Sequence, residues 1–167
     1  MSAEGKEIVL NILGAGELFG EIALIDGKDR SADATVMENA ELVVIDVRDF
    51  MPFLEERPEL ATHLLVMLCE RFRWVNDLYE DAIFMHLPAR LAKHLIRLGE
   101  SFGHESEEGV RIDIKLSQQD LGNLMGTTRE SVNKQMRTWI DSGIVSVDHG
   151  IITILDQNRL ALFCDPF

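Results

Sequence analysis

Two charged side chains near the C-terminal end of the chain have the types and the placing needed to read DNA bases. Arg129 and Glu130 are adjacent and follow two threonines. A guanidinium can bond O6 and N7 of guanine, and a carboxylate can accept from the amino group of cytosine. A helix that begins here would also direct unpaired N–H groups toward a phosphate. The alternative is that both side chains are only solvated surface charges.

The residues before this pair predict a first helix and a tight turn. Ser117 and Asp120 have the spacing of a capping box, with Asp in place of the usual Glu or Gln. Leu121 and Leu124 mark one apolar face of that helix. Gly126 can end it, because glycine adopts the positive φ that such a turn requires.

The residues after the pair predict a second helix. Thr127 or Thr128 can cap it, and Gly143 can end it. Its buried face is expected at a spacing of four residues, and its outward face includes Arg129, Asn133 and Lys134. The residues expected to be buried are Val132, Met136 and Ile140.

Two β-branched runs, 144–147 and 151–154, flank Asp148-His149-Gly150 and predict a hairpin. A helix pair joined by a tight turn and followed by a hairpin is the pattern of a winged helix-turn-helix. We therefore expect the C-terminal half of the chain to bind DNA.

A second candidate site lies in a glycine-rich segment near the N-terminal end. It combines Glu21 with Arg30 and Ser31. A carboxylate can accept from a sugar hydroxyl, and a guanidinium pairs well with a phosphate. The alternative is a structural ion pair between Glu21 and Arg30. The segment is not a P-loop, because no Gly-Lys-Ser/Thr follows at the required spacing.

The elements around this second site are expected to be short strands and two helices. Strands are predicted over 7–13, 35–36 and 42–45, and Asp49 is expected to cap a short helix that ends before Pro58.

No glycine or proline interrupts the next helix, from Pro58 to His86. Apolar side chains there alternate spacings of four and three, which is a heptad pattern, and the charged Arg71 lies among them. The alternatives are a dimer seam, which we prefer, and one long core helix. The pattern comprises Leu64, Leu68, Arg71, Val75, Leu78, Ala82 and Met85.

Three further elements are expected before the helix-turn-helix. Pro88 opens a helix that runs to about Leu98, residues 99–109 form a polar loop, and 111–115 alternates like a half-exposed strand.

The charge of the chain is unevenly distributed. The net charge is −13, but residues 1–80 carry 7 basic and 17 acidic side chains, whereas residues 111–167 carry 6 and 7. The acidity is therefore concentrated away from the predicted DNA-binding region. It would repel DNA and lower non-specific affinity.

Several classes of protein are not indicated. No apolar stretch is long enough to span a membrane, and the polar N-terminus is not a signal peptide. The two cysteines, Cys69 and Cys164, lack metal spacing and suit a reducing, cytoplasmic setting. The histidines are scattered and no Gly-x-Ser-x-Gly elbow occurs, so we expect neither an enzyme nor a metal site.

The segment Leu116–Val132, LSQQDLGNLMGTTRESV, resembles the helix-turn-helix signature of the Crp/Fnr (catabolite activator protein) family of transcription regulators. The resemblance implies that Arg129 and Glu130 read bases. It implies the same for Lys134, where the best-known member has arginine, and lysine lacks the planar fork of arginine. The remaining implied positions hold phosphates: Ser117, Gln119, Thr128 and Ser131.

The segment Phe19–Leu24, FGEIAL, with Arg30-Ser31-Ala32 resembles the phosphate-binding cassette of cyclic-nucleotide-binding domains. The resemblance implies that Glu21 bonds the ribose and that Arg30 and Ser31 bind the cyclic phosphate of cAMP or a similar nucleotide. The implied ligand-binding set is Gly20, Glu21, Ile22, Ala23, Arg30, Ser31, Ala32 and Asn76.

Two departures from the family pattern bear on the ligand. The family's Thr-Ser pair on the central helix corresponds to Val75 and Asn76, and valine cannot form a hydrogen bond with a nucleobase. The chain also begins at a strand that lies deep within the sensor roll of its relatives, so the first strands of the roll are expected to be missing.

Together these features predict an α+β fold: a partial jelly-roll-like β-roll over 1–50, a linker and long dimerisation helix over 51–87, and a winged helix-turn-helix over 88–167. The expected function is a homodimeric, cyclic-nucleotide-gated regulator that binds a pseudo-palindromic site in double-stranded DNA. The dimer would form through the Leu64–Met85 helix. RNA polymerase is left open as a further partner, and no membrane is expected.

Two alternatives remain. The first is a DNA-binding regulator that is ligand-independent or responds to another signal. The second is a cyclic-nucleotide-binding module that has no DNA role.

Overall fold

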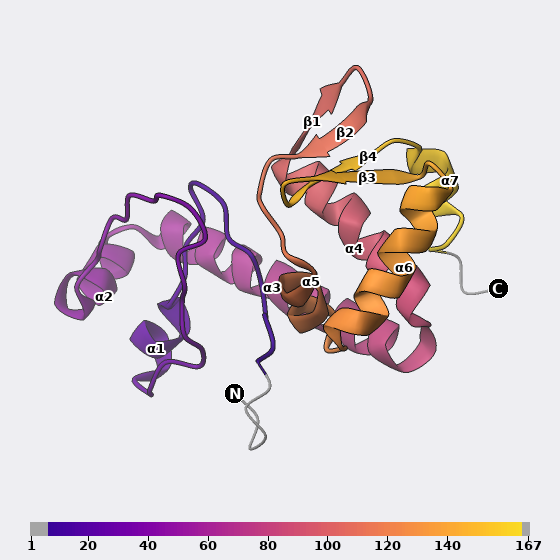
Figure 1. The fold of residues 1–167 in the computed structure, drawn as a ribbon. Coiled ribbons are helices and arrows are strands. Elements are labelled where there is room, and N and C mark those ends of the chain that lie inside the picture. Colours follow the sequence, from indigo (N-terminus) through magenta and orange to yellow (C-terminus); the bar gives the residue numbers. More distant parts are fainter. Residues whose placement is uncertain (1–6, 165–167) are drawn as a thin grey trace. The chain divides into compact units, whose positions relative to one another are not determined.

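The structure, a computed structural model, describes residues 7–164 and forms two compact units. One unit is Ala15–Tyr79, and the other contains the remaining described residues. Figure 1 shows the elements of both in one ribbon. We call them the sensor unit and the helix-turn-helix unit and describe each by itself. Among the described residues, no helix is both long enough and apolar enough to cross a membrane.

The helix-turn-helix unit contains four helices and one antiparallel sheet. Its helix α4 packs against α5, α7 and three of the strands. The sheet has the strand order β1-β2-β4-β3. The helices are α4 (Leu87–Phe102), α5 (Gln118–Met125), α6 (Arg129–Asp141) and α7 (Gln157–Ala161). The strands are β1 (Gly103–Ser106), β2 (Gly109–Ile112), β3 (Val145–Asp148) and β4 (Ile151–Ile154).

The core of this unit is built from the inner faces of α4 and α6 and from the sheet. Leu91, Leu95 and Trp139 have no exposed surface, and Ile152 is 1% exposed. The rings of Trp139 and Phe163 meet edge to face, with their centroids 5.4 Å apart. This core fixes the face that α6 turns toward solvent.

The predicted buried face of α6 is wrong at its last position. Val132, Met136 and Trp139 are buried, whereas Ile140 is 41% exposed. At 3.6 residues per turn, Trp139 lies about 20° around the helix axis from Val132, but Ile140 lies about 80° away. A strict spacing of four residues drifts off the buried face, and Trp139 takes the predicted place of Ile140.

The region before the helix-turn-helix also differs from the prediction. Helix α4 continues to Phe102, and the expected polar loop over 99–109 contains β1 and the start of β2. The strand expected at 111–115 begins instead at Gly109 and ends at Ile112. Pairing explains the shift, because β2 bonds β1 on one side and β4 on the other. The polar β1 sequence gives no alternation from which to predict a strand.

The wing hairpin agrees with the sequence. Strands β3 and β4 pair antiparallel, with Asp148 opposite Ile151. The two residues between them, His149 and Gly150, have φ values of 48° and 85°. Two consecutive positive φ values are characteristic of a type I′ turn, which suits the twist of a tight hairpin.

The sensor unit contains three helices: α1 (Glu21–Asp26), α2 (Val47–Glu56) and most of α3 (Pro58–Phe84). Asp46 rather than Asp49 caps α2, and its side chain accepts from the backbone N–H of Arg48. Helix α3 begins at Pro58, as predicted.

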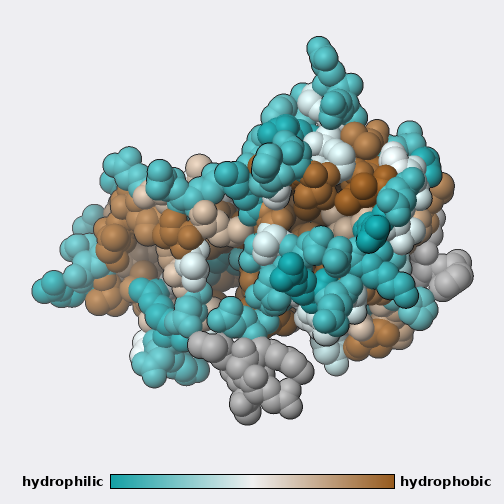
Figure 2. All heavy atoms as spheres, in the orientation of Figure 1, coloured by the Kyte–Doolittle hydropathy of each residue, from teal (hydrophilic) through white to brown (hydrophobic). Residues whose placement is uncertain are grey.

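The strands predicted over 7–13, 35–36 and 42–45 are not formed, since the described residues 7–46 contain no strand. A strand is stable only when its N–H and C=O groups pair with a neighbour. Side chains of the 42–45 run are instead exposed, Val43 by 93% and Val44 by 87%. Both units carry apolar side chains at the surface (Figure 2).

Residues 7–14 group with the helix-turn-helix unit rather than with the sensor. The backbone N–H of Val9 donates to the carbonyl of Asn123 at 3.1 Å, and Ile12 packs against the core of that unit. Ile12 is half-buried there, whereas Ile8 and Leu10 are exposed, so packing on this unit accounts for only part of the apolar run that suggested a strand.

Candidate functional site

The helix-turn-helix is assembled by local capping interactions. The hydroxyl of Ser117 accepts from the N–H of Asp120 at 3.1 Å, and the Asp120 carboxylate accepts from the N–H of Ser117 at 2.8 Å. This is the predicted capping box, and it fixes the start of α5.

The turn between α5 and α6 depends on a glycine and on an arginine of another helix. Gly126 ends α5 with a φ of 60°, the left-handed conformation that was expected there. A guanidinium N–H of Arg90 donates to the carbonyl of Met125 at 3.3 Å. The turn therefore satisfies part of the C-terminal end of α5 and directs the chain into α6.

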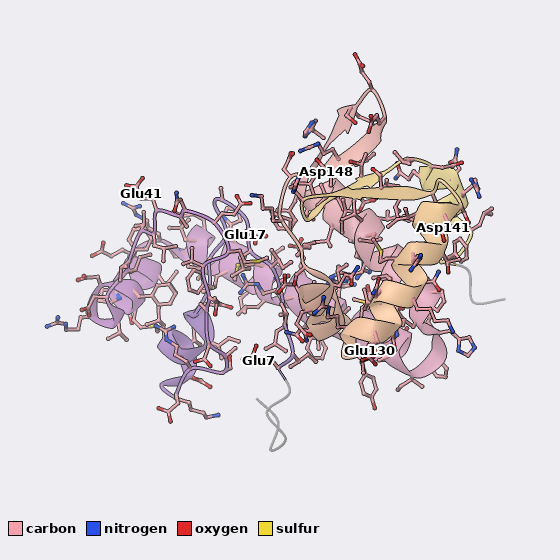
Figure 3. All side chains as sticks on the ribbon, viewed as in Figure 1. Glu7, Glu17, Glu41, Glu130, Asp141 and Asp148 are labelled. Carbon is pink, nitrogen blue, oxygen red and sulfur yellow. The ribbon has the colours of Figure 1, made fainter. Side chains whose placement is uncertain are left out.

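The N-terminus of α6 presents the predicted reading residues to solvent. Thr128 caps the helix, its hydroxyl accepting from the N–H of Ser131 at 3.2 Å. Arg129 and Glu130 are the first two residues of α6, and both are exposed, as is Lys134 one turn later. Figure 3 labels Glu130 at this end of α6 and Asp148 in the wing. The structure thus places the three residues on one short, exposed stretch of helix.

The residues expected to hold phosphates also border this stretch. Each capping hydroxyl, of Ser117 and of Thr128, uses an acceptor lone pair to bond an N–H group. A hydroxyl also carries one donor, which suits a phosphate oxygen. The hydroxyls of Thr128 and Ser131 bond each other at 2.9 Å, so one O–H of this pair is used and the other remains for a phosphate. Gln119 lies on α5, where its amide N–H donates to Asn123 at 2.8 Å and one N–H is left over.

The cassette is organised around a buried carboxylate. Glu21 is 1% exposed, and its Oε1 forms an ion pair with Nη1 of Arg71 at 2.5 Å. The second oxygen, Oε2, is buried without a hydrogen-bond partner. A buried acceptor left unpaired costs roughly 1–3 kcal/mol, so a hydroxyl donor placed there would be favoured.

The sequence missed the role of Arg71. It was expected in the dimer seam, but it binds Glu21 and also donates to the carbonyl of Leu18. In the sequence, the only sign of this role was a charged residue within an apolar heptad. The partner of Arg71, Glu21, lies 50 residues away, so spacing could not reveal the pair.

Arg30 does not pair with Glu21, the alternative that the sequence left open. Its guanidinium donates to the carbonyl of Gly20, the residue that caps α1 with a φ of 79°. A Cβ at Gly20 would meet the flexible end of the Arg30 side chain, but the positive φ of Gly20 itself favours glycine at this position. Arg30, Ser31 and Ala32 are exposed in an irregular segment, where an anion can reach the guanidinium.

The other predicted cassette residues are spread over two helices. Ile22 is 48% exposed on α1, and Ala23 supplies the carbonyl that accepts from the N–H of Gly27. Asn76 lies exposed on α3 beside Val75, which is 52% exposed. The fit to a cyclic nucleotide is therefore good at the carboxylate and the guanidinium and weaker at Val75.

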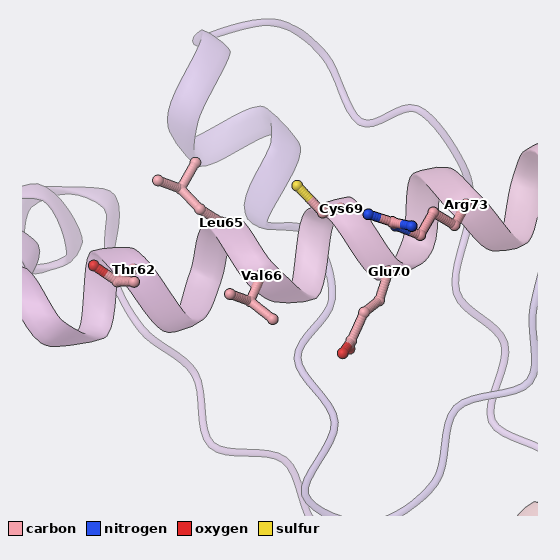
Figure 4. Close-up of a pocket in the computed structure, with 6 residues that line it drawn as sticks. All are labelled: Thr62, Leu65, Val66, Cys69, Glu70 and Arg73. Carbon is pink, nitrogen blue, oxygen red and sulfur yellow. The ribbon is translucent and has the colours of Figure 1, made fainter.

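The predicted heptad positions on α3 are turned toward their own chain, apart from Val75 and Ala82. A second set, one residue further along, has the same alternation of four and three and is exposed. We call it the outer seam: Leu65, Cys69, Phe72, Asn76, Tyr79 and Ile83. Leu65, Phe72 and Tyr79 are 62%, 68% and 69% exposed. Figure 4 shows the hollow on this helix that Leu65 and Cys69 help to line.

The fold and the α6 surface define a winged helix-turn-helix protein built to bind DNA. Comparison with known proteins supports this class. Residues 89–163 match the family model described as a Crp-like helix-turn-helix domain, and residues 1–57 match the cyclic nucleotide-binding domain.

Two curated relatives cover most of the chain. The chain is 32% identical to the CRP-like cAMP-activated global transcriptional regulator of Mycobacterium tuberculosis, over 95% of this chain and 70% of the relative. It is 30% identical to the cyclic AMP receptor protein of Thermus thermophilus, over 93% of this chain and 69% of that protein. The chain belongs to the Crp/Fnr family of transcription regulators.

Solved structures agree on the fold. A c-di-GMP-responsive global regulator from Xanthomonas campestris matches with a TM-score of 0.66 at 18% identity, over 91% of this chain and 76% of that one. A variant of CooA from Carboxydothermus hydrogenoformans also has a TM-score of 0.66, at 21% identity, over 72% of this chain and 56% of that one. The chain thus spans just over half the length of the latter. The names record cAMP for the two curated relatives and c-di-GMP for the Xanthomonas campestris regulator.

Proposed function

We propose that the chain binds an operator in double-stranded DNA through the N-terminal end of α6 and that a cyclic nucleotide, cAMP by preference, controls this binding. The exposed, capped start of α6 is the observation that carries the proposal. In such a motif the first exposed side chains of the second helix meet base edges in the major groove.

Each residue at this surface has a defined role. Arg129 bonds the O6 and N7 atoms of guanine, Glu130 accepts from cytosine, and Lys134 adds a positive charge beside them. Phosphate contacts come from the residues at the two helix starts: Ser117, Gln119, Thr128 and Ser131. Phosphate contacts orient the protein, and base contacts select the sequence.

The test of DNA reading is operator binding by a variant that carries Arg129→Ala and Glu130→Ala. Loss of at least about 100-fold in affinity is expected, since each good bidentate pair discriminates by about 1–3 kcal/mol. Glu56→Ala with Arg57→Ala is the matched control, because it removes the same two charges from the end of α2. Retained binding by the first variant would overturn the site assignment.

The effector proposal rests on Glu21 and Arg30. A bound cyclic nucleotide would supply a hydroxyl donor and a single negative phosphate. The unpartnered Glu21 Oε2 accepts from the hydroxyl, and Arg30 with Ser31 binds the phosphate. Arg71 holds the other oxygen of Glu21 and so orients this carboxylate. The remaining proposed contacts are Gly20, Ile22, Ala23, Ala32 and Asn76.

Operator affinity with and without cAMP tests the control step. We expect tighter binding with cAMP and loss of this difference in Arg30→Ala. Lys28→Ala is the control, because it removes a nearby exposed positive charge that pairs with Asp26. Equal affinities with and without cAMP in the unaltered chain would reject control by cAMP and favour a regulator that is ligand-independent or responds to another signal.

We also propose that the chain is a homodimer through the outer seam of α3. Two parallel helices pair through such a heptad stripe, and a single polar residue within it, here Asn76, sets the register. Two-fold symmetry places two α6 helices about 34 Å apart, one turn of DNA. Phe72→Glu should give a monomer by sedimentation. Phe84→Glu, on the same helix but outside the seam, should leave the dimer intact.

A further inference from the structure

A side-chain hydrogen bond joins the two helices of the helix-turn-helix. Nε2 of Gln118, the first residue of α5, donates to Oδ1 of Asn133 in α6 at 3.1 Å. Asn133 is exposed and lies one turn beyond Arg129. The bond therefore holds an exposed amide in one orientation at the proposed DNA surface.

Asn133 lies within the arc that the reading residues define. At 3.6 residues per turn it is about 40° from Arg129 and about 60° from Glu130 around the helix axis. It is also only about 6 Å along the axis from Arg129, at a rise of 1.5 Å per residue. When Arg129 and Glu130 contact a base, Asn133 is therefore close enough to reach the adjacent base.

We propose that Asn133 is a further base-reading residue and that Gln118 fixes which bases it accepts. A free asparagine offers both an acceptor and a donor and so suits the N7 and N6 atoms of adenine. Here Oδ1 is held by Gln118, and the amide NH₂ is the group left to face the groove. Asn133 therefore accepts bases that present acceptors, guanine through O6 and N7, thymine through O4 or adenine through N7, and rejects cytosine, whose edge offers only a donor.

The orientation of this amide can be reversed by one substitution. In Gln118→Glu the donor is replaced by an oxygen that only accepts. The NH₂ of Asn133 then turns toward α5, and Oδ1 faces the groove. The preference at the base that Asn133 contacts should change from an acceptor base to a donor base, adenine or cytosine.

The experiment selects binding sequences for the full chain with cAMP, from duplexes randomised over about 24 base pairs, which hold two half-sites one turn apart. The unaltered chain, Asn133→Ala and Gln118→Glu are compared. Asn133→Ala should lose the preference at one base pair per half-site, and Gln118→Glu should invert it by about tenfold, the effect of 1.4 kcal/mol. The preferences set by Arg129 and Glu130 should remain in both variants.

Gln135→Glu is the matched control, because it places the same charge on α6 about 200° around the axis from Asn133, at 3.6 residues per turn. It should lower affinity without changing any base preference. The proposal rests on the proposed DNA binding, and the outcomes separate the two. If the unaltered chain selects no sequence, the proposed function fails. If it selects one, and Asn133→Ala and Gln118→Glu select the same one, the role of Asn133 is overturned and the proposed function stands.

Discussion

The two units of the chain differ sharply in how they bury apolar surface. Among the described residues, every buried apolar side chain except Phe50 belongs to the helix-turn-helix unit. The sensor unit instead exposes apolar side chains such as Val43, Val44 and Phe72. In the helix-turn-helix unit, the helix pair α5–α6 and the hairpin β3–β4 are each formed by elements that follow one another in the sequence. A β-roll needs strands from distant parts of a chain to pair before any of them is stable.

The two candidate sites also differ in what holds their residues in place. The proposed reading residues lie on α6, whose own buried side chains, Met136 and Trp139, anchor the helix in the core. The cassette is fixed by one ion pair, between Glu21 and Arg71, and by contacts to the carbonyls of Leu18 and Gly20. The DNA surface should therefore tolerate changes in the sensor unit, whereas the cassette should depend on single residues.

The largest effect is expected from Trp139→Ala. It removes a fully buried ring from the helix-turn-helix unit and should cost about 3–5 kcal/mol of its unfolding free energy, as for other large aromatic truncations. The unit's unfolding is followed by circular dichroism. The chain's other tryptophan, Trp74, lies in the sensor unit, so its fluorescence reports that unit separately.

Trp139→Phe is the control for that prediction. The indole N–H of Trp139 is buried without a partner, so phenylalanine keeps most of the packing and removes an unsatisfied donor. It should cost much less than alanine. If Trp139→Ala shifted the Trp74 transition as far as it shifted the other unit, the division into two independently stabilised units would be wrong.

The features that were predicted correctly from the sequence depend on residues that are close together in the chain. The capping box joins Ser117 to Asp120, three residues later, and the left-handed conformation that ends α5 is one that Gly126 adopts by itself. The features that were predicted wrongly depend on partners that the spacing of residues in the sequence does not reveal. Strand β1 depends on pairing with β2, and the role of Arg71 depends on Glu21. Spacing along the chain could not show that the exposed heptad on α3 lies one residue beyond the predicted one.

The second prediction tests the sensor unit at its ion pair. Arg71→Met leaves the Glu21 carboxylate buried and unpaired. Loss of one partner of a buried pair costs 3–5 kcal/mol, and about 2–3 kcal/mol is expected here because the Arg71 side chain is 29% exposed. Fluorescence measures it in chains that also carry Trp139→Phe, where Trp74 is the one tryptophan. Glu21→Gln in the same chain should restore much of the loss, because it removes the buried charge. No restoration would mean that Arg71 acts through packing alone.

The third prediction concerns pH and the helix-turn-helix unit. Burial, and secondarily the charge of Arg97, lowers the pKa of His94 from 6.5 to about 4. The unfolded chain then binds a proton at a higher pH than the folded one. The contribution of His94 to the free energy of unfolding is fully present above about pH 7. It decreases as the pH drops toward 4, and about 2 kcal/mol is lost at pH 5. Denaturant titrations at pH 8 and pH 5 measure this loss.

His94→Gln is the variant that isolates this contribution, because glutamine is polar but does not titrate. The loss between pH 8 and pH 5 should be smaller in the variant by about the same 2 kcal/mol. An equal loss in both chains would show that other groups cause it. The sensor unit, followed through Trp74 in chains that also carry Trp139→Phe, should not respond to His94→Gln.

The smallest effect is expected at the turn of the helix-turn-helix. No atom lies within 4 Å of a Cβ built at Gly126, so alanine there meets no neighbour and its cost is purely conformational. At a φ of 60° that cost is about 1 kcal/mol of unfolding free energy. Gly126→Asn should cost less, because asparagine adopts this conformation more readily. Denaturant unfolding of the two variants measures the difference. If alanine and asparagine cost the same, the left-handed turn does not limit stability there, and the unit owes its stability to Trp139 and the rest of its core alone.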